Sequence, residues 1–203
     1  MVRRSQGRMR TAAFAAALLG SCGVVDTASA YTASGDRLFP ATILLPQIAP
    51  GDEFYTNVMT VPQTPGGLGT PNRATNFNEV YAKTITDRFA IFVEETYTRL
   101  DRVGGGTLSG WQNFDMAGKY LAVLDLPHEF LLTLGLDREF GGTGATRVGA
   151  SPSGATTPQV FFGKGLGDLD IGYWRPLAFT GFVGYQAADN HPRPDQVVGG
   201  LTL

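Results

Sequence analysis

Alternation of apolar and polar residues is the feature that most constrains what this chain can fold into. From residue 53 onward apolar side chains recur at every second position, as in Phe130, Leu132, Leu134 and Leu136, and helical spacing is almost absent. A period of two places successive side chains on opposite faces of a β-strand. The sequence therefore predicts an all-β chain with strands at about residues 53–61, 75–85, 89–99, 110–123, 128–140, 158–165, 177–186 and 197–203.

The connections between these strands alternate in length. Those at 62–74, 100–109, 141–157 and 187–196 are long and rich in Gly or Pro, whereas those at 86–88 and 124–127 are short. Outer-membrane barrels have long external loops, short periplasmic turns and tilted strands of about 9–11 residues. The pattern predicts an antiparallel, up-and-down transmembrane β-barrel of outer-membrane type with about eight strands. The connection at 166–176 departs from this pattern, because it should be short.

The first 30 residues have the layout of an export signal. Four arginines lie within residues 1–10, an apolar stretch covers 11–25, and Ala28 and Ala30 supply the small residues that signal peptidase requires. We expect a signal peptide at 1–30, an irregular segment at 31–52 and a barrel domain at 53–203. A second interpretation also stands, in which Cys22 follows a lipobox-like Leu-Gly-Ser and becomes acylated.

Composition excludes several classes of protein. Sixteen Lys and Arg face 18 Asp and Glu without a basic cluster beyond residue 10, which argues against a nucleic-acid partner. One Cys and two His argue against a disulfide framework and a metal site, and we expect no cofactor. Catalysis is not expected either, because His128 falls at the opposite end of the predicted barrel from Ser109 and Ser151, and a nucleophile must contact its base.

Charged residues on the predicted strands are the candidates for the barrel interior. In a membrane barrel they would face the lumen, since a Lys facing lipid at the midplane costs ~2–4 kcal/mol. They either line a solute path or form an internal network of salt bridges that fills it. The predicted lumen-facing residues are Glu79, Lys83, Asp115, Lys119, Glu129, Asp137 and Glu139.

Aromatic residues gather near the predicted strand ends. Amphipathic rings settle at the headgroup level of a bilayer, so this placement is typical of a barrel girdle. The alternative is the general enrichment of aromatic residues in strands. The girdle candidates are Tyr97, Trp111, Tyr173, Trp174 and Tyr185.

Several short motifs resemble a known family. They are Phe39–Thr42 with Asp52–Phe54, Gly110–Asn113 with Lys119 and Tyr120, His128–Phe130 with Gly135–Asp137 and Gly141–Gly144, and Phe162–Leu169 with Arg175–Ala178 and Thr180-Gly181. Together they resemble the bacterial outer-membrane barrels named meta-pathway phenol-degradation proteins or transporters. The resemblance implies an outer-membrane barrel that passes small hydrophobic or aromatic compounds, and it supplies no catalytic residues.

The resemblance also sets an expectation for the end of the chain. Family members continue through several more strands, whereas this sequence stops at Val197–Leu203 without a terminal aromatic residue, which favours a truncated member over an unusually small barrel. We therefore expect an outer-membrane protein whose partners are the lipid bilayer and a small solute. The alternatives are a water-soluble periplasmic barrel or sandwich that binds a ligand or partner, and a non-functional fragment.

Overall fold

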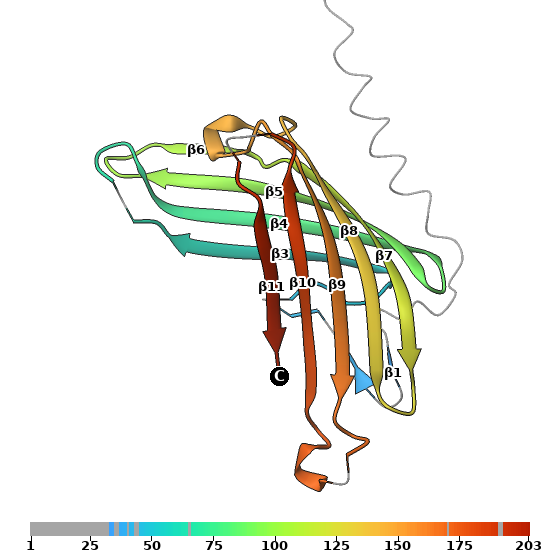
Figure 1. Cartoon of the computed structure of the whole chain (residues 1–203). Coiled ribbons are helices and arrows are strands. Elements are labelled where there is room, and N and C mark those ends of the chain that lie inside the picture. Colours follow the sequence, from blue (N-terminus) through green and yellow to red (C-terminus); the bar gives the residue numbers. More distant parts are fainter. Residues whose placement is uncertain are drawn as a thin grey trace, which may run out of the picture.

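The computed structural model describes residues 33–34, 37–39, 41–42, 45–64, 66–169, 171–190 and 193–203, and these residues form strands and two short 3-10 helices (Figure 1). The strands are β1 (Ala33–Ser34), β2 (Arg37–Leu38), β3 (Glu53–Pro62), β4 (Pro71–Thr86), β5 (Phe89–Arg102), β6 (Thr107–Trp111), β7 (Phe114–Asp125), β8 (Phe130–Phe140), β9 (Ala155–Gly165), β10 (Ala178–Ala188) and β11 (Gln196–Thr202). The 3-10 helices are η1 (Thr146–Val148) and η2 (Gly172–Trp174).

The main sheet follows the order of the chain. Its strands pair antiparallel in the order β11-β10-β9-β8-β7-β5-β4-β3, and β6 pairs with β5 beside this path. The sheet curls into a half-barrel with β3 and β11 at its edges (Figure 1). The predicted all-β, up-and-down architecture is therefore confirmed in the described residues as an incomplete barrel.

The two ends of the half-barrel carry different connections. Residues 87–88, 126–129 and 166–177 join strands at one end, which we call the turn end. Residues 63–70, 103–106, 141–154 and 189–195 join strands at the other, the loop end. The connection at 166–177 is long and holds η2, so it still departs from the expected alternation of lengths.

One predicted strand is interrupted. Residues 110–123 were expected to form a single strand, but β6 ends at Trp111 and β7 begins at Phe114. At the interruption the N–H of Gln112 still donates to the carbonyl of Thr96 on β5 at 2.8 Å, and the carbonyl of Trp111 accepts a hydrogen bond from the N–H of Ala145 at 2.8 Å. The expected loop at 62–74 is also shorter than predicted, since β4 already begins at Pro71.

The hairpin from β5 to β6 depends on glycine. Gly104, Gly105 and Gly106 have φ angles of 83°, 94° and 83°. Side chains with a Cβ rarely adopt such angles, whereas glycine adopts them without steric cost. Three consecutive glycines therefore allow the chain to reverse within residues 103–106.

Apolar side chains form two small clusters on the concave face of the half-barrel. One consists of Val80, Ala82, Ala90 and Phe92, with Tyr55 and Ala117 packed against it. The other joins Leu121, Leu131 and Phe161 of the sheet to Phe39, Ile48 and Ala49 of the N-terminal segment. Residues before β3 thus pack inside the curl of the sheet.

Candidate functional site

Acidic side chains from three neighbouring strands form a row on the concave face. Glu94 of β5 lies opposite Asp115 of β7, and Asp115 lies opposite Glu139 of β8. Asp137 follows on β8, two residues closer to the turn end. All four alternate with residues of the other face, so the pleat directs them to the side where Phe92 and Leu131 are buried.

Amide and guanidinium groups hold the outer members of this row. The side-chain nitrogen of Asn78 donates to Glu94 at 2.6 Å, and that of Asn113 donates to Glu139 at 2.6 Å. Arg193, from the connection after β10, forms an ion pair with Glu139 at 2.5 Å. Charge-assisted hydrogen bonds of this kind fix the position of a carboxylate.

Lys119 of β7 lies closer to the turn end and is only 5% exposed. Its ammonium nitrogen lies 4.3 Å from the ring centroids of both Phe92 on β5 and Phe161 on β9. These strands are separated by β7 and β8, so their inward side chains converge on one point. The convergence identifies this side of the sheet as the concave one.

The prediction placed Glu79 and Lys83 with these charges, and the structure corrects that placement. Both alternate along β4 with Val80 and Ala82, which are buried on the concave side, so Glu79 and Lys83 project from the convex face. Glu79 lies directly opposite Glu95 of β5 on that face. Lys83 forms an ion pair with Asp52, whose pKa is held below its usual value by this hydrogen bond.

Glu129 does not belong to the row either. It lies just before β8 at the turn end, 8% exposed. Arg37 donates to its carboxylate at 3.0 Å, and the N–H of Gly167 donates to it at 2.8 Å. The structure therefore brings together Asp115, Lys119, Asp137 and Glu139, and sets Glu129 apart at the rim.

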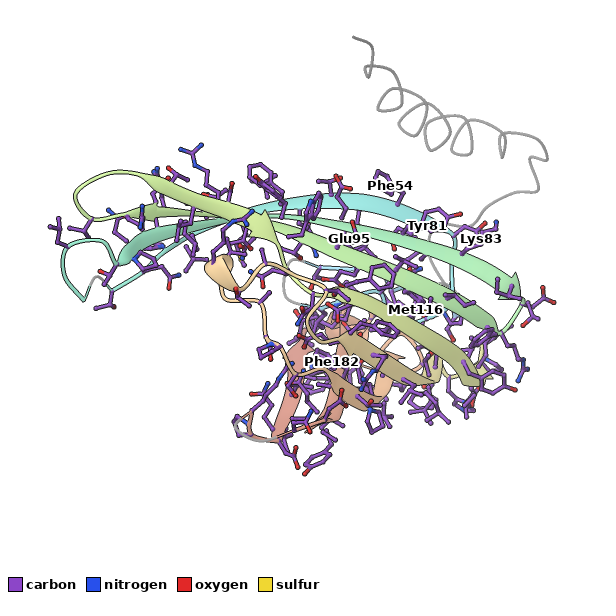
Figure 2. All side chains as sticks on the ribbon, turned by 90° about the horizontal axis from the view of Figure 1, so that it is seen from above. Phe54, Tyr81, Lys83, Glu95, Met116 and Phe182 are labelled. Atoms are coloured by element: carbon purple, nitrogen blue, oxygen red, sulfur yellow. The ribbon has the colours of Figure 1, made fainter. Side chains whose placement is uncertain are left out.

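The convex face carries large apolar side chains in the open. Figure 2 shows Phe54 projecting from β3 on the side turned away from Phe182 of β10, whose ring stacks on Phe161 inside the curl. Other exposed apolar residues continue this face along β4 to β11. They include Phe77, Tyr81, Met116, Tyr120, Leu134, Leu136, Val160, Val183, Val197 and Leu201.

Charges on the convex face lie near the strand ends on β8 and β9 but reach the middle of β4 and β5. Lys164, next to last in β9, contacts Asp168 at 2.7 Å, and this hydrogen bond lowers the pKa of Asp168. Near the loop end, Arg138 of β8 binds Asp189 at 2.6 Å. On β4 and β5 the outward charges run from the pair of Glu79 and Glu95 to the loop end, where Arg73 and Arg99 both form ion pairs with Asp101.

The five predicted girdle residues fall at both ends of the half-barrel. Tyr97 and Trp111 pack edge to face near the loop end with centroids 5.2 Å apart, and the hydroxyl of Tyr185 donates to Asp195 at 2.8 Å at the same end. Tyr173 and Trp174 lie in η2 at the turn end, and both are exposed. Their role as a girdle remains a prediction.

Some sequence predictions fall on residues that are not described. The signal peptide at 1–30, its residues Ala28 and Ala30, and Cys22 all lie outside the described part of the chain. The segment at 31–52 is described in part. It contains the short pair β1 and β2 and otherwise lacks regular strands in its described residues.

Sequence reasoning did not identify several residues of the concave face. Glu94 and Glu95 are adjacent, so alternation could not say which of them faces inward until the register was known. Arg193 and Phe39 lie outside the main strands, where no periodic pattern exists. The inward Asn78 and Asn113 had a usable signal, since buried amides are typical partners of carboxylates.

Chemical groups that bind metals do not cluster in the described residues. No group of three or more His, Cys, Asp or Glu that could hold a metal ion occurs there. Within the same residues, no helix is both long and apolar enough to span a bilayer. No protein-family model, curated protein or solved structure matches the chain, so the resemblance to outer-membrane barrels remains a prediction.

Proposed function

We propose that this chain is an outer-membrane β-barrel protein whose concave face lines a passive path for small solutes. One observation carries the proposal: charged and polar side chains gather on the concave face, whereas large apolar side chains stand exposed on the convex face. Two small apolar clusters also lie on the concave face, but a water-soluble sheet would not leave so many large apolar side chains exposed on its other face. This distribution suits a protein that has hydrocarbon outside and water inside.

The exposed apolar surface is extensive, although the carboxylates of Glu79 and Glu95 lie on the same face. Water-soluble monomers rarely expose apolar patches beyond a few hundred Å² unless the patch binds something. Here the exposed residues run from Phe54 on β3 to Leu201 on β11, across the whole sheet. The strands β7 to β10 have 11 or 12 residues, which is enough to cross a bilayer at a tilt.

The charges of the concave face indicate which solutes pass. Four carboxylates lie there with Lys119 and Arg193, so negative charge predominates among the residues of this cluster. A wall with one predominant sign of charge attracts solutes of the opposite sign. The proposed path therefore favours cations and polar cationic solutes over anions.

A bilayer also imposes a condition on the edges. Hydrocarbon offers no hydrogen bonds to the backbone, so open sheet edges are not tolerated where lipid reaches them. Within the described residues β3 and β11 each have only one neighbour. In the membrane both edges must pair with further strands before the barrel can conduct.

The test compares two pairs of carboxylates that are matched in spacing. Glu94 and Asp115 lie opposite each other on the concave face, and Glu79 and Glu95 lie opposite each other on the convex face. The protein would be purified from the bacterial envelope and inserted into planar bilayers. We expect the double variant Glu94→Gln, Asp115→Asn to lower cation selectivity, and Glu79→Gln, Glu95→Gln to leave it unchanged. Equal effects, or no conductance in any variant, would contradict the proposal.

A further inference from the structure

The N-terminal segment packs inside the curl of the sheet as if it were part of the core. Phe39, Ile48 and Ala49 are 2%, 1% and 1% exposed. They contact Leu121 and Phe161, which belong to β7 and β9. Residues that precede the sheet thus occupy space on the concave face that a solute path would need.

Glycine makes room for this segment. At Gly163 of β9 a Cβ would lie 2.8 Å from Cδ1 of Phe39 and 2.9 Å from Cδ1 of Ile48, closer than real Cβ contacts. The backbone of Gly163 lies within the regular ladder with Leu131 and Thr180, so the strand itself does not require glycine. The missing side chain serves the packing of the segment.

Polar contacts fix the same segment at the turn end. Arg37 binds Glu129 at 3.0 Å, and the hydroxyl of Ser34 donates to the carbonyls of Asp125 and Phe130 at 3.1 Å and 3.2 Å. The ammonium of Lys119 donates to the carbonyl of Gln47. The segment therefore covers the concave face near one mouth of the half-barrel.

The seated segment also has a feature that favours its release. The side-chain amide of Gln47 is buried, and neither its nitrogen nor its oxygen has a hydrogen-bond partner among the described residues. A buried amide without partners loses its hydrogen bonds to water and regains them on exposure. Beyond the segment, Asp52 is held by the N–H of Thr84 at 2.6 Å, so β3 stays anchored if the preceding residues leave.

We propose that the described residues of 34–49 form a removable plug that closes the solute path at the turn end. The inference rests on the proposed function, because it names the element that regulates that path. In the closed state Phe39 and Ile48 fill the space above Gly163. In the open state the plug leaves the concave face and the row of carboxylates becomes continuous with the turn-end mouth.

The first experiment measures whether the plug is seated and whether Gly163 controls it. In a Cys22→Ser background the chain has no other cysteine, so Ile48→Cys or Leu38→Cys introduces a single thiol. Ile48 is 1% exposed and Leu38 is 60% exposed. With a membrane-impermeant maleimide, we expect the thiol at position 48 to react roughly tenfold more slowly than the thiol at position 38. Equal rates in the unmodified barrel would overturn the inference.

The second experiment adds Gly163→Val, with Gly118→Val as the matched control. Valine suits a strand at both positions, but Gly118 lies on the convex face beside Phe89 and cannot touch the plug. We expect Gly163→Val to raise the labelling rate at position 48 to that of position 38 and to raise conductance in planar bilayers. Gly118→Val should change neither.

The outcomes distinguish a failure of the plug inference from a failure of the proposed solute path. If Gly163→Val exposes position 48 but conductance stays equal to that of the unmodified protein, the segment does not close the path and the inference is wrong. If no variant conducts although position 48 becomes exposed, the proposed function fails and the plug fails with it. A conductance that rises only together with labelling supports both.

Discussion

The ammonium group of Lys119, in the middle of β7, donates a hydrogen bond to the backbone carbonyl of Gln47, 72 positions earlier in the chain. The contact joins the sheet to the segment that precedes it. Because Lys119 also interacts electrostatically with Asp137 and Glu94 of the concave row, it links the seating of that segment to the charge of the proposed path.

Lys119→Met should make the path more selective for cations. Methionine keeps much of the side-chain volume but removes the positive charge and the hydrogen bond to Gln47, which as a charge-assisted bond contributes about 1.5–3 kcal/mol. The reversal potential in a salt gradient across a planar bilayer measures the change. Lys83→Met, on the convex face, is the control and should leave the potential unchanged. Equal shifts in both variants would place Lys119 outside the path.

Leu134→Arg distinguishes lipid from water as the solvent of the convex face. Leu134 is 47% exposed, so it is not part of a packed core. In hydrocarbon near the midplane, arginine there should lower the free energy of unfolding by ~2–4 kcal/mol. In water, a substitution at such a surface position changes stability by about 0.5 kcal/mol or less.

Urea unfolding in lipid vesicles measures this difference. Leu68→Arg, at a position 86% exposed in the connection after β3, is the control and should cost little in either solvent. A Leu134→Arg variant as stable as the control would refute the placement of this face in lipid.

Asn113→Leu should destabilise the loop end. The side chain of Asn113 is 4% exposed, donates to Glu139 and to the carbonyl of Ser151, and accepts from the N–H of Gly144 at 3.0 Å. Each buried polar group left without its partner costs about 1–3 kcal/mol. The free energy of unfolding reports the loss. Asn72→Leu, an exposed position on β4, provides the comparison, and equal costs would show that these contacts contribute nothing.

Asp189→Asn should destabilise the fold at neutral pH and should have little effect on its stability in acid. A hydrogen bond from Arg138 holds the pKa of Asp189 below its usual value of 3.8. A group whose pKa is depressed by folding stabilises the fold above the unfolded pKa, and this stabilisation is lost as pH falls through the folded pKa. The urea midpoint of Asp189→Asn should therefore lie below that of the unmodified protein at neutral pH and approach it as the pH falls below 3.8 and through the lowered pKa of Asp189. A gap that does not change with pH would contradict this assignment.

Much of the fold could be predicted because the strands repeat one simple pattern. In β8 the outward Leu134 and Leu136 alternate with the inward Thr133 and Asp137, and a period of two identifies such a strand without knowledge of its neighbours. The same reasoning failed for Glu79 and Lys83. Both faces of β4 mix polar and apolar residues, so alternation separates the faces but does not say which one is inward.

Residues of other strands determine which face of β4 points inward. Val80 and Ala82 are buried because Phe92 of β5 and Tyr55 of β3 pack on them, and those contacts depend on the register of three strands. The N-terminal segment escaped prediction for a related reason. Its contacts with Phe161 span more than a hundred residues of sequence, and an irregular segment has no period to indicate where it packs.

The open edges of the half-barrel determine whether an even or an odd number of added strands can close it. Counting along the main path, β3 and β11 are separated by seven antiparallel steps, so the two edge strands run in opposite directions. A closed ring in which every neighbour is antiparallel must therefore gain an even number of strands between them. A single added strand would be parallel to one of the edges. The chain can be completed by whole hairpins, or by a second copy of the same eight-strand path, but not by one strand alone.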